Sequence, residues 1–457
     1  MANISKNKVQ EWAATQRGGI IMDLMEFVNI ESVSSPECTS PPFGSGCQNA
    51  LAWMLEKGKS FGLQGCDYDH YAGSLSLHGE EKTNPEQVTG IWCHLDVVPA
   101  GEGWHTPPYQ AQYRDGLITG RGAQDNKSAA ILGLYVLKGL QELDISLSRP
   151  AALYFGISEE CGMQDLDYFL SHFSAPGLSL IADCGFPACY GEKGSYVIRI
   201  TGKDQTDYDV CDLNAGIAHN IIPDYVSARI QTREGSHMLS AVGTSGHSAF
   251  PAGSKNAIPA FLEQLFTLPD IKSDCQSLHA IYALASSCDG APAGICFKDP
   301  EYGDLTCCVT KLYWDKRIWQ ADLDIRYPHS VDPDTIFAKL FAYAGEHNCS
   351  IETVSHLPSF GFSKEHPIIQ KLTEVYTRET HCSSEAYAMA GGTYAAKLPN
   401  AIPFGIAFPD KSMIYDRFPK GHGDYHQPDE SVIVDQIIDA LVIYLLALIE
   451  IDSLPID

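Results

Sequence analysis

The chain has 457 residues, too many for one ordinary domain, so its length predicts two. Its 57 acidic residues outnumber 31 basic ones, and the formal net charge of -26 disfavours nucleic acid and anionic membranes as partners. A hydrophobic fraction of 44% is typical of a globular protein with a large core. The first residues contain no apolar signal segment, and the 15 Cys show no paired metal-binding spacing. We therefore expect a cytoplasmic protein.

The first part of the chain alternates between strand and helix patterns, which predicts a layered α/β sheet. The most buried helix is expected over Asn126–Leu143, because its apolar residues occupy more than one face. The first helix is expected to be interrupted at Gly18-Gly19. The other elements of this part are expected at Val9–Phe27 (helix), Gln48–Phe61 (helix), Asp67–His78 (strand), Gln87–Asp96 (strand), Arg149–Ile157 (strand), Asp165–Phe173 (helix) and Leu178–Ala182 (strand).

The alternation of strand and helix patterns changes after Asp183, and the long helical pattern of the first part returns near Pro367. The intervening stretch predicts an α+β block, with a hairpin formed by Leu305–Trp314 and Ile318–Arg326. The chain ends in an apolar helix expected over Ser431–Ile451. The predicted fold is therefore a split α/β domain, residues 1–187 and 358–457, with an inserted α+β domain, residues 188–357. We expect a mixed, mostly parallel sheet with helices on both faces.

The strand that ends at His94 presents the first candidate site residues. Residues two apart on a strand face the same side, so His94 and Asp96 can face one site. A carboxylate beside an imidazole orients it and raises its basicity, as at metal-bound His residues. Taken alone, this pair favours a structural or incidental role over a metal site.

Further candidates follow other predicted strands or lie in neighbouring loops. Asp125 precedes a helix, Glu159 and Glu160 follow a buried strand, Asp183 follows another, and His426 lies in a Gly-rich turn. Each alone also fits a structural explanation; Asp125, for example, is a favourable helix N-cap. Together these residues favour a shared ligand site over separate structural roles, because ligands bind at the carboxyl ends of parallel strands. Two His and several carboxylates gathered there suit zinc.

Five segments spread over nearly the whole chain carry a more specific pattern. They are His94–Trp104, Gly120–Lys127, Ser158–Glu160, Asp183–Pro187 with Gly191–Gly194, and His426–Glu430. In this order they resemble the M20 family of metallopeptidases and amidohydrolases, and within it the dipeptidase V branch. The resemblance implies a split α/β catalytic domain with an inserted lid domain that binds substrate. It also implies two divalent metal ions, zinc first, with manganese and cobalt as alternatives.

The resemblance implies a role for each of the metal-site candidates. Asp125 would bridge the two metals. His94 and Asp183 would complete the ligands of one metal, and Glu160 and His426 those of the other. A cis peptide bond after Asp125 is also implied.

The catalytic roles implied by the resemblance go to two acids and one His. Asp96 would orient the metal ligand His94. Glu159 would be the general base, because a carboxylate near the metals that does not bind them can move a proton. His247, in the inserted domain, would donate a hydrogen bond to the developing oxyanion.

The resemblance also implies a substrate-binding set. Asn220 and Arg326 would hold the substrate carboxylate, which a guanidinium fork binds through both oxygens. Gly392 and Thr393 would line the substrate, with close approach of the backbone. His422 lies near His426 and fits either a supporting or a surface position.

The chain departs from the pattern of this branch at positions beside the site. Asn126-Lys127-Ser128 stands where a second Asp followed by Lys-Gly-Pro is usual. Ile157-Ser158 and Cys184-Gly185 replace Thr-Asp and Ala-Glu. None of these departures removes an expected ligand or base, so they bear on substrate and metal preference.

The resulting hypothesis is a metal-dependent dipeptidase that cleaves short unblocked peptides. An M20 amidohydrolase that removes an N-acyl group, of the desuccinylase or aminoacylase type, is the alternative. A relative that binds peptides without cleaving them is disfavoured, because all five expected ligands and Glu159 are present. The long inserted domain favours a monomer over a dimer, since members with shorter lids dimerise to borrow the lid His. The expected partner is a small peptide substrate.

Overall fold

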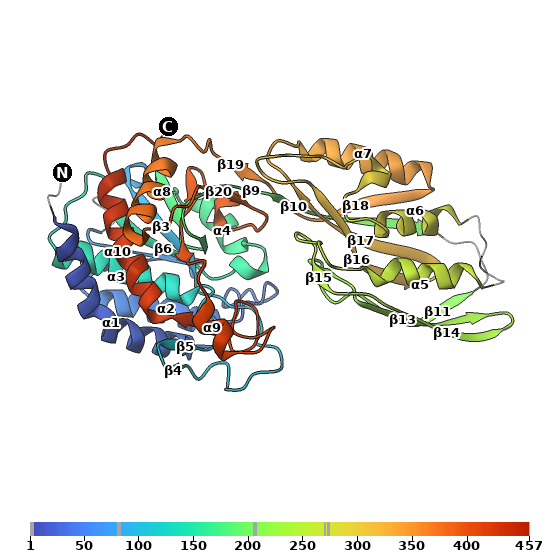
Figure 1. Cartoon of the computed structure of the whole chain (residues 1–457), viewed down its shortest axis with the longest axis horizontal. Coiled ribbons are helices and arrows are strands. Elements are labelled where there is room, and N and C mark those ends of the chain that lie inside the picture. The colour runs from blue at the N-terminus through green and yellow to red at the C-terminus, as the bar shows by residue number, and fades with distance from the viewer. Residues whose placement is uncertain (1–3, 80–83, 204–207, 269–270, 272–274, 457) are drawn as a thin grey trace. The chain divides into compact units, whose positions relative to one another are not determined.

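The computed structural model describes residues 4–79, 84–203, 208–268, 271 and 275–456. The chain forms two compact units, and Figure 1 labels many of their helices and strands. The first unit comprises Met1–Tyr190, Phe362–Tyr387 and Thr393–Asp457. The second comprises Gly191–Gly361 and Ala388–Gly392. The first unit is thus built from segments far apart in the sequence.

A six-stranded sheet, in the order β1-β2-β6-β3-β7-β21, forms the centre of the first unit. The strand β3 lies between β6 and β7 and runs parallel to both, and β21 is parallel to β7. Every residue of β3 and β6 is buried, which explains their nearly continuous apolar sequences. The strands are β1 (Gln64–Tyr68), β2 (Ala72–Ser76), β3 (Thr89–His94), β6 (Ala151–Gly156), β7 (Leu178–Ile181) and β21 (Ala401–Pro403).

Helix α3 (Lys127–Glu142) packs against β3 and β6 and is buried over most of its length. Helix α1 (Lys6–Val28) runs without a break through Gly18-Gly19, so the expected interruption is wrong. A Cβ added at Gly19 would lie 2.4 Å from the Tyr135 Oη, so glycine allows α1 and α3 to approach closely. The other helices of this unit are α2 (Ser45–Ser60), α4 (Gln164–His172), α8 (Pro367–Thr380), α9 (Ser412–Arg417) and α10 (Val434–Ile451).

Short strands replace two of the expected longer elements. The stretch expected as one strand over Asp67–His78 contains the end of β1, a turn and the whole of β2, which pairs with β1 in antiparallel orientation. The expected C-terminal helix begins only at Val434, because Ser431–Ile433 forms β23 and pairs with β5 (Leu117–Thr119). The remaining short strands of this unit are β4 (Gln112–Arg114), β8 (Cys184–Gly185) and β22 (Ile406–Ala407); β9 (Cys189–Glu192) and β20 (Tyr387–Met389) cross the unit boundaries, and β19 (Phe360–Gly361) belongs to the second unit.

The second unit contains a four-stranded sheet in the order β16-β17-β10-β18. The expected hairpin is present, with Asp315 paired to Ile318 across a two-residue turn. The hydrophobic core of the second unit includes Ile198, Phe261 and Leu323, all fully buried. The elements are β10 (Gly194–Lys203), β11 (Asp209–Ala215), β12 (Ile221–Ile222), β13 (Tyr225–Thr232), β14 (Gly235–Val242), β15 (Gly246–His247), α5 (Ala257–Phe266), α6 (Gln276–Ala285), β16 (Thr306–Asp315), β17 (Ile318–Tyr327), α7 (Pro333–Glu346) and β18 (Cys349–Leu357).

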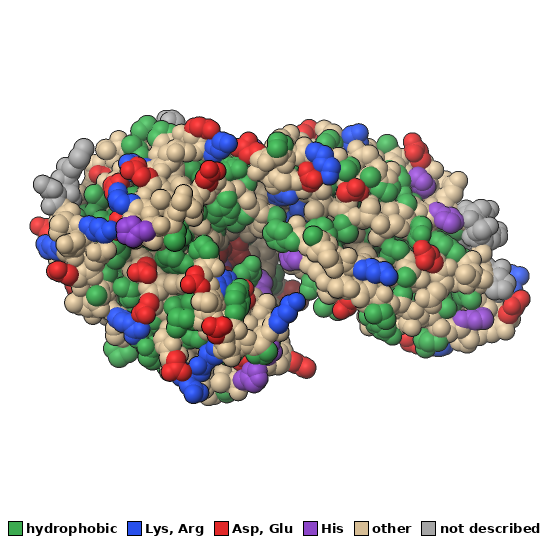
Figure 2. All heavy atoms as spheres, in the orientation of Figure 1, with side chains coloured by type: hydrophobic (Ala, Val, Ile, Leu, Met, Phe, Trp, Pro, Cys, Tyr) green, Lys and Arg blue, Asp and Glu red, His purple; other side chains and the backbone are tan. Residues whose placement is uncertain are grey.

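The predicted fold class, a mixed and mostly parallel α/β sheet accompanied by an α+β part, is confirmed. Within the described ranges, no helix is both long and apolar enough to cross a lipid bilayer. Figure 2 shows acidic and basic side chains interspersed on the visible face of each unit.

Candidate metal centre

The site begins where β3 ends. His94 is the last residue of β3, and its imidazole is almost fully buried. Its Nδ1 lies 3.0 Å from the Asp96 backbone oxygen and 3.3 Å from Asp96 Oδ1. These contacts direct Nε2 toward Asp125, whose Oδ1 is 3.0 Å away. The predicted pairing of His94 with Asp96 is therefore present in the structure.

Asp125 lies between the two candidate His ligands. Its Oδ1 contacts His94 Nε2, and its Oδ2 lies 3.1 Å from His426 Nε2. Each carboxylate oxygen thus faces a different imidazole. The peptide bond between Asp125 and Asn126 is cis, as the resemblance implies.

The Asp125 loop is held by a buried acid, Glu430, which the sequence reasoning did not identify as a site residue. Glu430 Oε1 accepts hydrogen bonds from the backbone N–H groups of Gln124 and Asp125, both at 2.9 Å. Its Oε2 accepts from Gly122 N–H at 3.1 Å and from Arg121 Nη1 at 2.6 Å. One carboxylate therefore fixes the backbone that presents Asp125. In the sequence, the available signal was its place at the end of the matching segment His426–Glu430.

Glu159 and Glu160 lie in a single 3₁₀ turn, Glu159–Cys161, directly after β6. Their backbone N–H groups donate to the two oxygens of Asp96, each at 3.1 Å. Asp96 therefore positions His94 and both glutamates. The Glu160 Oε1 lies 3.0 Å from His426 Nε2. The loop carrying His426 thus meets the Glu160 turn.

Asp183 follows β7, and its Oδ2 lies 3.9 Å from His94 Nε2. The side-chain amide of Asn126 donates to Asp183 Oδ1 at 2.8 Å and to the Ala182 oxygen at 3.0 Å. Asn126, one of the departures in sequence, therefore ties the Asp125 loop to the end of β7. Ligand atoms of His94, Glu159 and Asp183 lie within 4.8 Å of one another, as do those of His94, Asp125 and Glu160.

Electrostatics makes this cluster suited to cations. Burial raises the pKa of Glu159 and Glu160 above the usual range, and neighbouring carboxylates raise them further. Burial likewise raises the pKa of Asp183 to about 7. Burial opposes charge on His426 as well, yet its hydrogen bonds to Asp125 and Glu160 raise its pKa to about 11. The carboxyl groups of this cluster lie close together, and their repulsion disfavours the ionised forms. Bound divalent cations would offset that negative charge.

The donor set fits such ions. Imidazole nitrogens and carboxylate oxygens are the ligands that zinc takes at sites with an open position. Manganese and cobalt also accept this mixture of nitrogen and oxygen. The residues present are therefore able to hold a divalent metal at the carboxyl ends of the parallel strands.

The three candidates predicted in the inserted domain, Asn220, His247 and Arg326, lie in the second unit, on elements that hydrogen bonds connect. The Asn220 backbone oxygen accepts from Ser248 N–H at 2.9 Å, directly after His247 on β15. Ser248 Oγ also donates to Asp324 Oδ2, and Arg326 Nε donates to the same oxygen at 3.2 Å. His247 and Asn220 are exposed, whereas Asp324 is fully buried. Asp324 thus links the elements that carry His247, Asn220 and Arg326.

Gly392 and Thr393 fall on opposite sides of a unit boundary. Gly392 belongs to the second unit, where an added Cβ would lie 2.4 Å from Leu357 Cδ2. Thr393 belongs to the first unit and is buried. Its Oγ1 accepts from Ala395 N–H at 3.2 Å and caps a 3₁₀ turn at Tyr394–Ala396.

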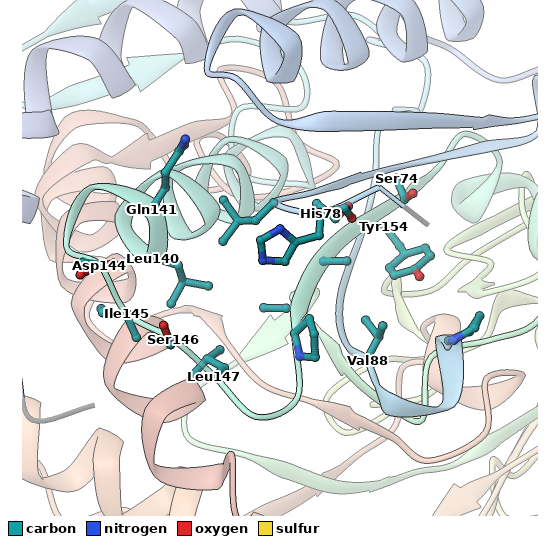
Figure 3. Close-up of a pocket in the computed structure, with 16 residues that line it drawn as sticks. Ser74, His78, Val88, Leu140, Gln141, Asp144, Ile145, Ser146, Leu147 and Tyr154 are labelled. Atoms are coloured by element: carbon teal, nitrogen blue, oxygen red, sulfur yellow. The ribbon is translucent and has the colours of Figure 1, made fainter. Parts of the chain in front are cut away.

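A cavity of about 330 Å³ lies elsewhere in the first unit. Figure 3 shows His78 and Tyr154 beside it, with Gln141 and Asp144 from the end of α3 and the loop that follows. Val88, which precedes β3, also lines it. The cavity is therefore at the amino ends of the parallel strands, opposite to the edge where His94 lies, and contains none of the predicted site residues.

The fold and the cluster first define a class: an α/β protein with a His and carboxylate centre, able to hold divalent metal, at the carboxyl ends of parallel strands. The sequence model of peptidase family M20/M25/M40 matches residues 90–450, and the chain belongs to this family. It is therefore a peptide-bond hydrolase, and the family-level resemblance is confirmed.

Individual relatives agree with this assignment. A protein of Staphylococcus epidermidis named "Putative dipeptidase" is 28% identical over 480 residues, covering 97% of this chain and 98% of its own. The di-peptidase Dug1p from Saccharomyces cerevisiae has a similar structure, with a TM-score of 0.63 at 11% identity and 99% coverage of both chains. Human carnosine dipeptidase 1 gives a TM-score of 0.61 at 13% identity, covering 98% of this chain and 99% of its own.

Proposed function

We propose that this protein is a dipeptidase that uses two divalent metal ions, with zinc as the preferred ion. The arrangement of Asp125 is the observation that carries the proposal. Its two oxygens face two different imidazoles, those of His94 and His426, at 3.0 and 3.1 Å. A carboxylate held in this way suits a ligand shared by two cations.

The ligand sets divide around Asp125. His94 and Asp183 would complete one set, and Glu160 and His426 the other. When bound, the ions would lower the pKa of a water molecule and polarise the substrate carbonyl. Asp96 keeps His94 in place through Nδ1, so that Nε2 is the nitrogen available to an ion.

Glu159 moves the proton in this proposal. Its buried carboxyl group has a pKa raised well above the usual range, because burial and the neighbouring Asp183 both disfavour its charge. A carboxylate there would accept a proton from the attacking water and pass it to the leaving amine. Asp96 accepts a hydrogen bond from the Glu159 backbone N–H at 3.1 Å, which holds the backbone from which this side chain extends.

The second unit would bind the substrate. Arg326 and Asn220 would hold the free carboxylate of a short peptide, and His247 would donate to the carbonyl oxygen as charge develops on it. Gly392 of this unit and Thr393 of the first would line the substrate through their backbone. The buried Asp324 supports this set by holding both Ser248 and Arg326.

The dipeptidase names of relatives support cleavage of dipeptides, and a monomer in the cytoplasm completes the proposal. The test is hydrolysis by the zinc-loaded protein of a panel of unblocked dipeptides beside N-acetyl and N-succinyl amino acids. We expect dipeptide cleavage that a chelator abolishes and added zinc restores. Cleavage of the N-acyl amino acids alone would replace this proposal with the amidohydrolase alternative.

A further inference from the structure

We propose that His105, His422 and Asp429 form an additional site for a divalent cation of the zinc class, separate from the cluster around Asp125. His105 Nδ1 and His422 Nδ1 lie 2.5 and 2.6 Å from the same atom, Asp429 Oδ2. The three potential ligand atoms lie within 4.8 Å of one another. The catalytic proposal uses none of these residues, so this site stands independently of it.

The three side chains match the ligand chemistry of zinc. Two imidazole nitrogens and one carboxylate oxygen form a set that zinc takes when a fourth position remains open. The Asp429 side chain is 1% exposed, whereas the His105 side chain is 63% exposed. A cation would therefore bind to a buried carboxylate and still reach solvent beside His105. Each imidazole would bind through Nδ1 with its proton on Nε2, so two hydrogen bonds to Asp429 are exchanged for bonds to the cation.

The site is held in place without a cation. Asp429 Oδ1 accepts from the His105 backbone N–H at 2.9 Å, which leaves Oδ2 for the two imidazoles. The loop before His105 is fastened by Trp104, whose Nε1 donates to the Ala100 oxygen at 2.8 Å. The Arg121 guanidinium lies over the Trp104 ring, 5.2 Å from its centre. The carboxylate and one imidazole are therefore presented on fixed backbone, which lowers the entropic cost of binding.

The position of this site suggests a stabilising role. Asp429 is followed directly by Glu430, which holds the backbone of Asp125. His422 lies in the same loop as His426. A cation at His105, His422 and Asp429 would therefore restrain the loop that reaches the catalytic cluster, without touching substrate.

The test counts zinc. Wild-type protein and the variants His105→Asn and His422→Asn are dialysed against a zinc buffer at micromolar free zinc, and the zinc content per chain is measured by mass spectrometry. We expect wild type to hold one zinc ion more per chain than either variant. Because the result is a difference between proteins, it does not depend on how many ions the catalytic cluster binds. Equal zinc content in all three proteins would overturn the proposal.

A matched control is available in His70. Its Nδ1 lies 2.8 Å from Asp67 Oδ2 and its side chain is 67% exposed, but this pair does not belong to a three-ligand group in the described part of the chain. His70→Asn should leave the zinc content unchanged; a loss equal to that of His105→Asn would mean nonspecific surface binding and overturn the proposal. Should His422→Asn fail to fold, the exposed position of His105 lets His105→Asn decide the question.

Discussion

The two units hold their candidate side chains in different ways. In the first unit, the buried carboxylates of Asp96 and Glu430 accept backbone N–H groups on either side of the cluster. In the second, His247 and Asn220 are exposed, and the buried Asp324 links their elements to Arg326. The first arrangement fixes charged groups before a substrate arrives, and the second leaves groups accessible to a ligand. We therefore expect changes at the cluster of the first unit to act mainly on kcat and changes at Asn220 and Arg326 mainly on KM, whereas His247 would also affect kcat because it would stabilise the developing oxyanion.

The largest effect is expected for Glu159→Gln. The amide cannot accept the proton from water, so kcat should fall by about 10²–10⁴-fold. Zinc content should not change, because the proposed ligands are all retained. Steady-state kinetics on a dipeptide, together with metal analysis, measures both quantities.

The control for this variant is Glu37→Gln, at an exposed position of the same unit. Loss of zinc from Glu159→Gln would instead place Glu159 among the ligands, which its closeness to His94 and Asp183 allows. Wild-type turnover would remove it from proton transfer altogether.

Glu430→Gln should have the next largest effect. The amide offers one acceptor oxygen where the carboxylate uses two, and it removes the charge that pairs with the buried Arg121. Changes to groups that support metal ligands typically cost about 10–100-fold in metal affinity or activity. We expect a loss of this size in zinc affinity, measured by competition with a chelating dye. Glu26→Gln, which alters a surface pair with Lys57, should bind zinc as wild type does.

Glu159 and Glu430 also illustrate what the sequence could predict. Glu159 was identifiable because it follows a buried strand beside other residues of a known motif. Glu430 belonged to a matching segment, but its role depends on contacts with residues about 300 positions earlier in the chain. Long-range backbone contacts of this kind lie outside the reach of periodicity and motifs.

The fold shows the same difference between features set by local sequence and features set by contacts with distant residues. Strands β3 and β6 were predictable because a fully buried parallel strand has a continuous apolar sequence. The break expected at Gly18-Gly19 was wrong, because the propensity of glycine was overridden by packing of Gly19 against Tyr135. The extra strand Ser431–Ile433 was missed because its pairing with Leu117–Thr119 joins segments remote in sequence.

Arg326→Lys tests the second unit. Lysine keeps the charge but lacks the planar fork that binds both oxygens of a carboxylate. A hydrogen bond to a charged group contributes about 1.5–3 kcal/mol, so KM should rise by roughly ten- to a hundredfold with kcat little changed. Arg229→Lys, which alters an exposed pair with Asp212 in the same unit, is the matched control. A fall in kcat of that size with unchanged KM would contradict the proposed role of Arg326 in holding the substrate carboxylate.

The smallest effect is expected for Thr393→Ala. The Thr393 hydroxyl caps the turn at Tyr394–Ala396 by accepting from Ala395 N–H. Removing a cap of this kind costs about 1 kcal/mol, so the free energy of unfolding of the first unit should fall by about that amount in urea denaturation. KM should stay the same, because the proposed contact of Thr393 with substrate uses its backbone. Thr393→Ser keeps the hydroxyl and should restore stability. A rise in KM that Thr393→Ser reverses would instead assign the Thr393 hydroxyl, and not the backbone alone, to substrate binding.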